Sequence, residues 1–354
     1  MNVHKIKDPL SKEGMPKNAA PRIALIGCGA IAESYYLPAL ARFPAVLEKL
    51  ILVDCDLARA KQMAARFGAR AIYPDYRSVT GDVDGAIIAA STHLHFPIAG
   101  EFLSLGKPVL CEKPLAESAA QAEALVERAR QTNAAFAANY LQRLIPSFAK
   151  VKEILASRAL GEVRSIHYQV GEEFDWPTSS GFYFNSPLTA RGVLRDRGAH
   201  VMDHICWWLE GKPEVIASQN DSYGGSEAVA FIRFTAGICW GTVKLSWLAS
   251  FPCRYVVACE GGTITGDVYD YQGFFLKDGQ DRAKRVQLHA KEKTKSSIAL
   301  KVVENFIRVI CNGERPLVSG CEVVDSLRFI DECYAAAGRP EMPWYEIGEV
   351  QNGH

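Results

Sequence analysis

The chain has 354 residues, and its 40 basic side chains are balanced by 40 acidic ones. This length favours two domains, each with its own core. The zero net charge gives no reason to expect nucleic acid or an anionic membrane as a partner. No apolar run approaches the roughly 20 residues that a membrane-spanning helix needs. Residues 1–20 carry four lysines but lack the apolar segment of a secretory signal, so we expect a flexible tail there.

The ten cysteines are scattered, and no two have a CxxC spacing. Several lie in apolar stretches, as Cys206 does beside Trp207. Buried, reduced thiols explain this pattern better than disulfides or zinc sites, so we expect a cytoplasmic protein. His200, Asp203 and His204 resemble part of a zinc-binding helix. Because a third ligand is missing, we expect no metal.

Short apolar strands alternate with amphipathic helices over the first 140 residues. Strands are expected at 22–26, 50–53, 71–73, 85–90, 108–111 and 134–139. Helices are expected from the end of the first strand to about residue 43, at 57–67, before residue 108, and at 118–132. Pro38 should kink the first helix, and Gly68 should end the second. This alternation is typical of a parallel sheet covered on both faces.

A glycine-rich motif, Gly27-Cys28-Gly29-Ala30-Ile31-Ala32, follows the first strand and opens a helix. The glycines allow a tight turn and close approach to a pyrophosphate, and the helix N-terminus offers free amides. Asp54 ends the second strand, where it can bind the ribose hydroxyls. No arginine adjoins it, which favours NAD over NADP. The sequence therefore predicts an α/β, Rossmann dinucleotide-binding domain over residues 21–140.

The pattern changes after residue 140. Helices are expected at 146–157, 297–311 and 321–337, with strands at 162–170, 229–234, 237–245 and 255–259. Period-two alternation and glycine-rich turns indicate a large, mostly antiparallel open sheet. We expect an α+β domain over residues 141–354. The stretch 277–295 holds seven basic and three acidic residues, which we interpret as a solvated loop rather than a phosphate-binding patch.

Three residues form a candidate catalytic set. Lys113 follows the strand at 108–111, so it should lie at the same sheet edge as the glycine loop. Asp196 and His200 are four residues apart, which places them on one face of a helix. Oxidation of an alcohol needs a base, a cation for the developing alkoxide and a group that orients the base. We assign His200 as acid/base, Lys113 as alkoxide stabiliser and proton relay, and Asp196 as substrate ligand and orienter.

At this point the chain resembles a known family, the Gfo/Idh/MocA (glucose–fructose oxidoreductase / inositol dehydrogenase) family. The resemblance covers about residues 21–340, and its motifs are GCGAIA at 27–32, STHLH at 91–95, CEKP at 111–114, Asn139-Tyr140 with Arg143, GVLRDRGAHVMD at 192–203 and CEGG at 259–262. It implies the same catalytic trio, and a homodimer or homotetramer built through the open sheet. The expected cofactor-binding residues are Gly27, Cys28, Gly29, Ala30, Ile31, Asp54, Ser91, Thr92, His95, Glu112 and Lys113.

Substrate contacts are expected from the trio and from five further residues. Tyr140 and Arg143 face the cleft in the family that the chain resembles. Trp176 lies in an aromatic stretch and could stack on a sugar ring or pack in an interface. Arg195 and Arg197 bracket Asp196 where apolar residues are common in that family. They either bind an anionic substrate group or pair with acids such as Asp203 and Glu210.

The sequence thus predicts an NAD-dependent oxidoreductase acting on a ring hydroxyl or ketone of a sugar, cyclitol or sugar derivative, including anionic or nucleotide-linked ones. Two other classes stay open. One is a glycoside hydrolase that uses NAD for a transient oxidation, and the other is a non-enzymatic dinucleotide-sensing regulator. The hydrolase would form no net NADH, and a sensor has no need of the proton-transfer residues.

Overall fold

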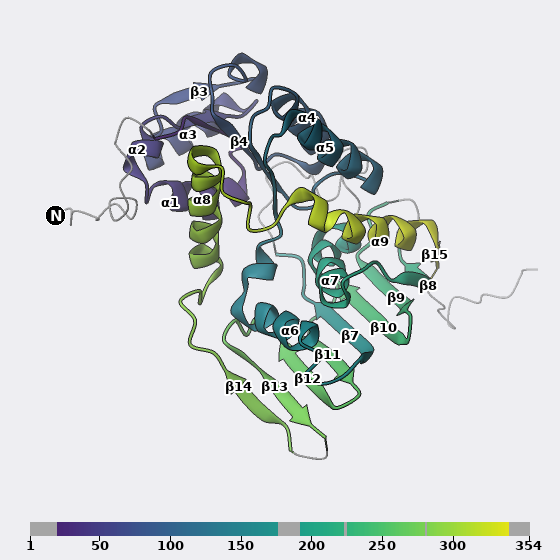
Figure 1. Cartoon of the computed structure of the whole chain (residues 1–354). Coiled ribbons are helices and arrows are strands. Elements are labelled where there is room, and N and C mark those ends of the chain that lie inside the picture. The colour runs from purple at the N-terminus through teal and green to yellow at the C-terminus, as the bar shows by residue number, and fades with distance from the viewer. Residues whose placement is uncertain (1–19, 176–191, 223–224, 280–281, 340–354) are drawn as a thin grey trace, which may run out of the picture.

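The computed structural model describes residues 20–175, 192–222, 225–279 and 282–339. Two domains lie one above the other in Figure 1, and the chain passes between them more than once. In these ranges no helix is both long and apolar enough to span a bilayer. All ten cysteines are free, and six of them are buried.

The first domain is built on a six-stranded parallel sheet with the strand order β3-β2-β1-β4-β5-β6. Its strands are β1 (Ile23–Ile26), β2 (Ile51–Val53), β3 (Ala71–Tyr73), β4 (Gly85–Ile88), β5 (Val109–Glu112) and β6 (Phe136–Asn139). The strand order reverses between β1 and β4, which is where a doubly wound sheet binds its ligand. The predicted Rossmann domain is confirmed.

Helices cover both faces of this sheet. They are α1 (Leu37–Leu40), α2 (Pro44–Leu47), α3 (Leu57–Phe67), α4 (His95–Ser104) and α5 (Ala119–Thr132). The helix after the glycine loop contains a π-helical turn, Ala32–Tyr36, just before Pro38. Proline has no N–H and its ring clashes with the preceding turn, so the wider turn accommodates it. The expected kink at Pro38 therefore takes this form.

The second domain contains a nine-stranded sheet with the order β14-β13-β12-β11-β7-β10-β9-β8-β15. Its strands are β7 (Val163–Gly171), β8 (Glu214–Asn220), β9 (Val229–Ala236), β10 (Cys239–Ser246), β11 (Phe251–Cys259), β12 (Gly262–Asp267), β13 (Gly273–Asp278), β14 (Lys284–Gln287) and β15 (Ala337–Gly338). Only the β7–β10 and β8–β15 pairs are parallel. The predicted, mostly antiparallel sheet is confirmed, although β8, β12, β13, β14 and β15 were not predicted.

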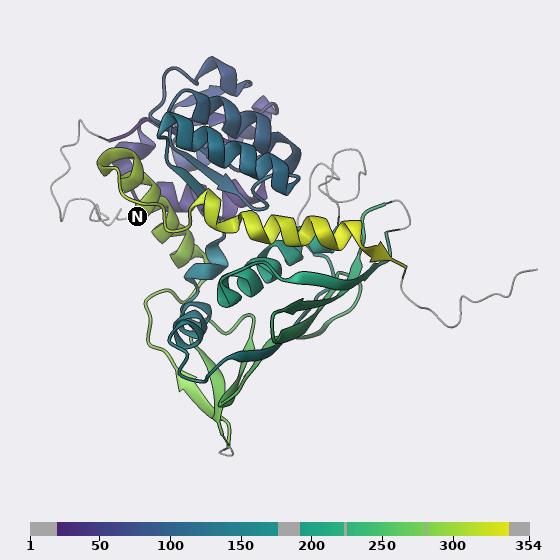
Figure 2. The same cartoon turned by 45° about the vertical axis from the view of Figure 1, so that its right-hand side comes forward.

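One face of this sheet carries α6 (Pro146–Ala156), α7 (Val193–Leu209) and α9 (Val324–Ala335) (Figure 2). The opposite face has no helix on it among the described elements, and it exposes Trp240 and Ile216 by 55% and 59%. That subunits join through this face stays a prediction.

The last two long helices return to the first domain. Helix α8 (Lys295–Asn312) packs on α1 and on the π-helical turn, and α9 packs on both α5 and α7 (Figure 1). Between them, Ala138 N–H donates to Val318 O at 3.0 Å. These contacts of α8, of α9 and of the segment between them join the two domains, and a cavity between the domains has walls from both.

Candidate active site

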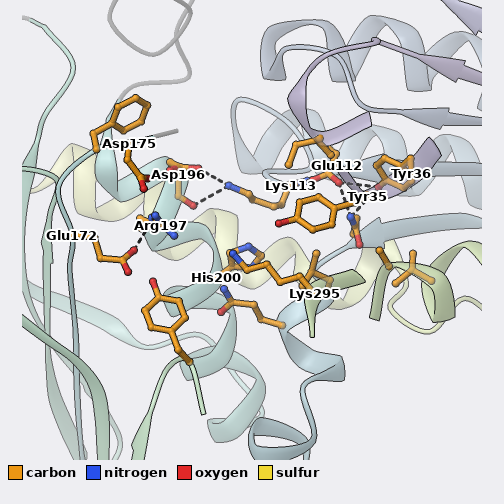
Figure 3. A pocket seen from close by; sticks show the side chains of 18 residues that line it. Tyr35, Tyr36, Glu112, Lys113, Glu172, Asp175, Asp196, Arg197, His200 and Lys295 are labelled. Carbon is orange, nitrogen blue, oxygen red and sulfur yellow. Dashed lines mark hydrogen bonds and ion pairs between the residues drawn. The ribbon is translucent and has the colours of Figure 1, made fainter. Parts of the chain in front are cut away.

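A cavity of about 470 Å³ lies between the two domains, and Figure 3 shows its side chains. Six residues expected from the sequence line it: Ile31, Glu112, Lys113, Asp196, Arg197 and His200. The cavity is also lined by seven polar residues that were not expected from the sequence: Tyr35, Tyr36, Gln142, Glu172, Asp175, Tyr269 and Lys295. The cavity thus combines the ends of Rossmann elements with one face of α7 and the first turns of α8.

An ion pair between Lys113 and Asp196 crosses from one domain to the other. Lys113 follows β5, and its Nζ donates to Asp196 Oδ1 at 2.5 Å and to the Asp196 carbonyl at 3.3 Å. Both side chains are mostly buried, at 17% and 18% exposed. The expectation that Asp196 orients His200 is not supported, because its carboxylate binds Lys113 instead.

His200 lies one helical turn after Asp196, on the same face of α7, as the spacing predicted. Burial, and then the positive charge of Lys113, hold the pKa of His200 well below its ordinary value. A neutral imidazole can accept a proton, which is what a base in alcohol oxidation must do. Its Nδ1 is buried without a hydrogen-bond partner in the described part of the chain, which leaves Nε2 for the cavity.

Glu112 anchors the strand end next to Lys113. Its Oε1 accepts hydrogen bonds from Tyr36 Oη at 2.8 Å and Asn139 Nδ2 at 2.5 Å. Burial raises the pKa of Glu112, while the bonds from Asn139 and Tyr36 and the charge of Lys113 oppose that rise. This network ties β5 and β6 to the helix that follows the glycine loop, so it fixes the backbone from which Lys113 projects.

The glycine loop fits a dinucleotide. Gly27 has φ +93°, and a Cβ there would lie 2.6 Å from Ala89 O, so only glycine is tolerated. A Cβ at Gly29 would meet nothing within 4 Å, which leaves open space beside the loop where a pyrophosphate would lie. Asp54 Oδ2 accepts from the Cys28 N–H at 2.7 Å, so this carboxylate also holds the loop in shape.

The residues after β4 differ in their exposure and in their contacts. Ser91 is partly exposed next to the loop, whereas Thr92 is buried at the start of a short 3-10 turn. His95 is 1% exposed, and its two ring nitrogens lie 2.8 Å from Pro114 O and 2.9 Å from Ala90 O. It therefore ties the ends of β4 and β5 together, and the expectation that it contacts the cofactor is not supported.

Two residues expected to touch substrate lie beneath the cavity rather than in its wall. Arg143 is buried, and its Nε and Nη2 donate to the two carboxylate oxygens of Asp203 at 2.8 and 2.7 Å. Tyr140 is 1% exposed and meets the ring of His200 edge-on at 6.1 Å. These two residues support α7 from below, which corrects the expectation of a substrate contact.

The arginines around Asp196 point to different places. Arg195 is buried, pairs with Asp331 at 3.0 Å and stacks on Tyr334, so it is removed from the expected anion site. Arg197 does line the cavity, where its Nη2 lies 2.9 Å from Glu172 Oε2. Trp176, expected to stack on a sugar, lies outside the described residues.

Glu227 fixes the start of the catalytic helix α7. Its carboxylate accepts from the Gly192 and Leu194 N–H groups, both at 3.0 Å, and its carbonyl accepts from the Val193 N–H at 2.8 Å. The first amides of a helix have no partner within the helix, so these bonds satisfy them. This contact could not be predicted from local patterns, because Glu227 comes after the helix in the chain and the whole strand β8 lies between them.

Two family models match this chain. The model described as "Oxidoreductase family, NAD-binding Rossmann fold" matches residues 21–140, and that of the GFO/IDH/MocA C-terminal domain matches residues 148–265. The chain belongs to the Gfo/Idh/MocA family of oxidoreductases. The resemblance on which the sequence analysis rested is therefore confirmed, and the chain is an enzyme of this oxidoreductase type.

Named relatives of this Gfo/Idh/MocA chain are dehydrogenases. It is 24% identical over 256 residues to trans-1,2-dihydrobenzene-1,2-diol dehydrogenase of Xenopus tropicalis, covering 69% of this chain and 74% of the relative. It is 33% identical over 202 residues to inositol 2-dehydrogenase of Acidothermus cellulolyticus, covering 55% of each.

Solved structures share the fold. Levoglucosan dehydrogenase in complex with NADH and levoglucosan superposes with a TM-score of 0.78 at 18% identity, covering 89% of this chain and 96% of that one. KijD10, a 3-ketoreductase from Actinomadura kijaniata in complex with NADP and TDP-benzene, gives 0.76 at 22% identity, covering 90% and 98%. The family model describes an NAD-binding domain, and of these two neighbours one holds NADH and the other NADP.

Replacing Arg143 by Ala is expected to destabilise the fold, because it leaves the Asp203 carboxylate buried without its partner. Breaking a buried pair in this way costs roughly 3–5 kcal/mol. Urea unfolding measures the loss. Arg130→Ala removes an exposed pair with Glu127 and should change the free energy of unfolding far less. Equal, small effects of both variants would contradict the structural role.

Stability should fall as the pH is lowered below about 6.5. Burial lowers the pKa of His204, stacked on Phe148 at 4.2 Å, to about 3. As the pH falls, His204 therefore takes up a proton in the unfolded chain before it does so in the folded protein. This lowers the free energy of unfolding by about 2 kcal/mol between pH 7 and pH 5. Unfolding at several pH values measures the slope. His204→Phe should flatten it and exposed His289→Gln should not; an unchanged slope in His204→Phe would contradict the prediction.

Proposed function

We propose that this protein is an NAD-dependent dehydrogenase or reductase that acts on a ring hydroxyl or ketone of a sugar, cyclitol or sugar derivative. The observation that carries the proposal is the shared cavity of Lys113, Asp196 and His200, beside a glycine loop shaped for a dinucleotide. The names of its relatives, inositol 2-dehydrogenase and levoglucosan dehydrogenase, support the substrate class.

Each member of the set has a chemical task in alcohol oxidation. NAD supplies the acceptor for the hydride that leaves the carbinol carbon. His200 enters the reaction neutral, so its Nε2 takes the hydroxyl proton. The ammonium of Lys113 stabilises the oxygen as negative charge develops on it. Asp196 holds that ammonium in place through their ion pair. The same groups return the proton in the reverse direction.

The preference for NAD over NADP rests on charge around Asp54. Oδ1 of Asp54 accepts from the Asp56 N–H, and Asp56 itself lies beside the adenosine end of the loop. A 2′-phosphate there would face two carboxylates. Arg59 lies 3.8 Å from the Asp56 carboxylate and offsets one of the two acids, so the group of Asp54, Asp56 and Arg59 keeps one excess negative charge. Each carboxylate keeps free lone pairs for ribose hydroxyls.

The two alternatives make different predictions. A glycoside hydrolase that uses transient oxidation needs the same residues but forms no net NADH. A dinucleotide sensor needs no base, yet His200 is held neutral at the cavity and Lys113 is held in a specific ion pair. The complete proton-transfer set argues against a sensor, and net NADH formation is what separates a dehydrogenase from the hydrolase.

Lys113→Met and His200→Asn should each lower kcat for NADH formation by at least 100-fold, because positioned acid–base groups contribute about 10²–10⁴. The assay follows NADH during oxidation of inositols and aldoses. Both variants should still bind NADH, which separates lost chemistry from lost folding. Turnover within a few fold of the native enzyme would rule out these roles, and glycoside cleavage without NADH would favour the hydrolase.

Native enzyme should bind NADH at least tenfold more tightly than NADPH, since the 2′-phosphate meets the Asp54 and Asp56 carboxylates. Titration of both cofactors by intrinsic fluorescence measures the two dissociation constants. Asp54→Ser should bring the dissociation constants of NADPH and NADH closer together, whereas Asp82→Ser, at an exposed position, should leave their ratio unchanged. Tighter binding of NADPH by the native enzyme would overturn the cofactor assignment.

A further inference from the structure

Lys295 is a cavity residue that neither the trio nor the dinucleotide loop explains. It is the first residue of α8, after the Thr294 N-cap, and its side chain reaches across the cavity toward His200 (Figure 3). It belongs to the stretch 277–295, which was interpreted as a solvated loop. The structure corrects that interpretation, because this lysine faces the interior of the site.

The other two cations of the cavity are already paired. Lys113 is bound to Asp196 and Arg197 to Glu172. Lys295 makes no ion pair or hydrogen bond within the described ranges, although it is only partly exposed. Burial, and then the charge of Arg197, lower its pKa. Its ammonium is therefore in an unfavourable environment that an added negative charge would relieve.

The position of Lys295 along α8 assigns it to the substrate end of the cavity. Lys295, Ala299 and Val302 are spaced to share one helix face, and all three line the cavity. Helix α8 packs on the π-helical turn after the glycine loop, and its later turns lie beside the first domain whereas its first turn lies nearer the second domain (Figure 1). Lys295 is about two turns from Val302, roughly 10 Å, at the end where the catalytic trio lies.

Resting on the proposed function, we propose that the substrate carries a carboxylate, and that Lys295 binds it beside Arg197. The class is a cyclic sugar acid, such as a uronate, whose oxidised ring hydroxyl lies at His200. A hydroxyl group alone would not compensate a half-buried ammonium, whereas a carboxylate forms a charge-assisted hydrogen bond with it.

The acidic residues of the cavity disfavour a phosphate group on the substrate. Glu172, Asp175 and Asp196 all line the cavity, and a dianion would be repelled by them more strongly than a carboxylate would. These three acids suit the neutral part of a sugar acid, because carboxylates accept hydrogen bonds from ring hydroxyls. Tyr269, which hydrogen-bonds Glu172, adds a further polar group to this side. The cavity thus offers a cation for the substrate carboxylate and hydrogen-bond acceptors for the substrate hydroxyls.

The test compares matched substrates that differ only in the acid. The native enzyme is assayed for NADH formation with glucose and glucuronate, with galactose and galacturonate, and with glucose 6-phosphate for the dianion. Binding of the same compounds to the NADH complex is measured by calorimetry. We expect the acids to exceed their parent sugars by at least about tenfold in kcat/KM and in affinity.

Substitutions test whether Lys295 is responsible for the preference for acids. Lys295→Gln should abolish the preference by raising KM for the acids while kcat changes little, and Lys295→Arg should keep most of it. Lys293→Gln removes the same charge from an exposed neighbour and should change nothing. Three results would each overturn the inference. The first is an unchanged preference for acids in Lys295→Gln, and the second is a preference of the native enzyme for neutral sugars or for the phosphate. The third is weaker NADH binding in Lys295→Gln but not in Lys293→Gln.

The two proposals fail separately. Acids that bind tightly through Lys295 without any NADH formation would refute the dehydrogenase proposal and leave the carboxylate site standing. NADH formation with no preference for acids would refute only the carboxylate site.

Discussion

The site depends on one ion pair that joins the two domains. Lys113 projects from the end of β5 in the Rossmann sheet, and Asp196 from the first turn of α7 in the second domain. Each partner is held by its own support. Glu112, Tyr36 and Asn139 fix the strand end, and Glu227 fixes the helix start. The distance between the two supports decides whether the ammonium and the carboxylate meet.

The pair also sets the electrostatics of the base. The positive charge of Lys113 helps to keep His200 unprotonated, so the cation that stabilises an alkoxide also keeps its neighbour able to accept a proton. Beneath them, the bidentate pair of Arg143 with Asp203 supports the same helix from the side away from the cavity. Charges above and below α7 thus have different tasks, one chemical and one structural.

The sequence predicted what local patterns and the rules of parallel sheets determine. The glycine loop, Asp54 and Lys113 each follow a strand, and parallel strands bring their carboxyl ends to one edge. Asp196 and His200 share a helix face because of their spacing alone.

The sequence could not predict partners that are far apart in the chain. Arg143 and Arg195 are charged residues close to catalytic ones, so a substrate contact was a reasonable hypothesis, but their carboxylate partners lie 60 and 136 residues away. Lys295 was missed for a local reason. Thr294 is a helix N-cap, and recognising it would have turned a basic stretch into the first turn of a cavity-lining helix.

The contact of Glu227 with α7 has a consequence for how such a site can diverge. The anchoring carboxylate comes from the segment before β9 and does not line the cavity, so helix placement and substrate recognition use separate residues. Arg197, Glu172 or Lys295 can then be exchanged without loosening the helix that carries the base. A scaffold arranged in this way can acquire new substrates by single substitutions while its proton-transfer geometry stays intact.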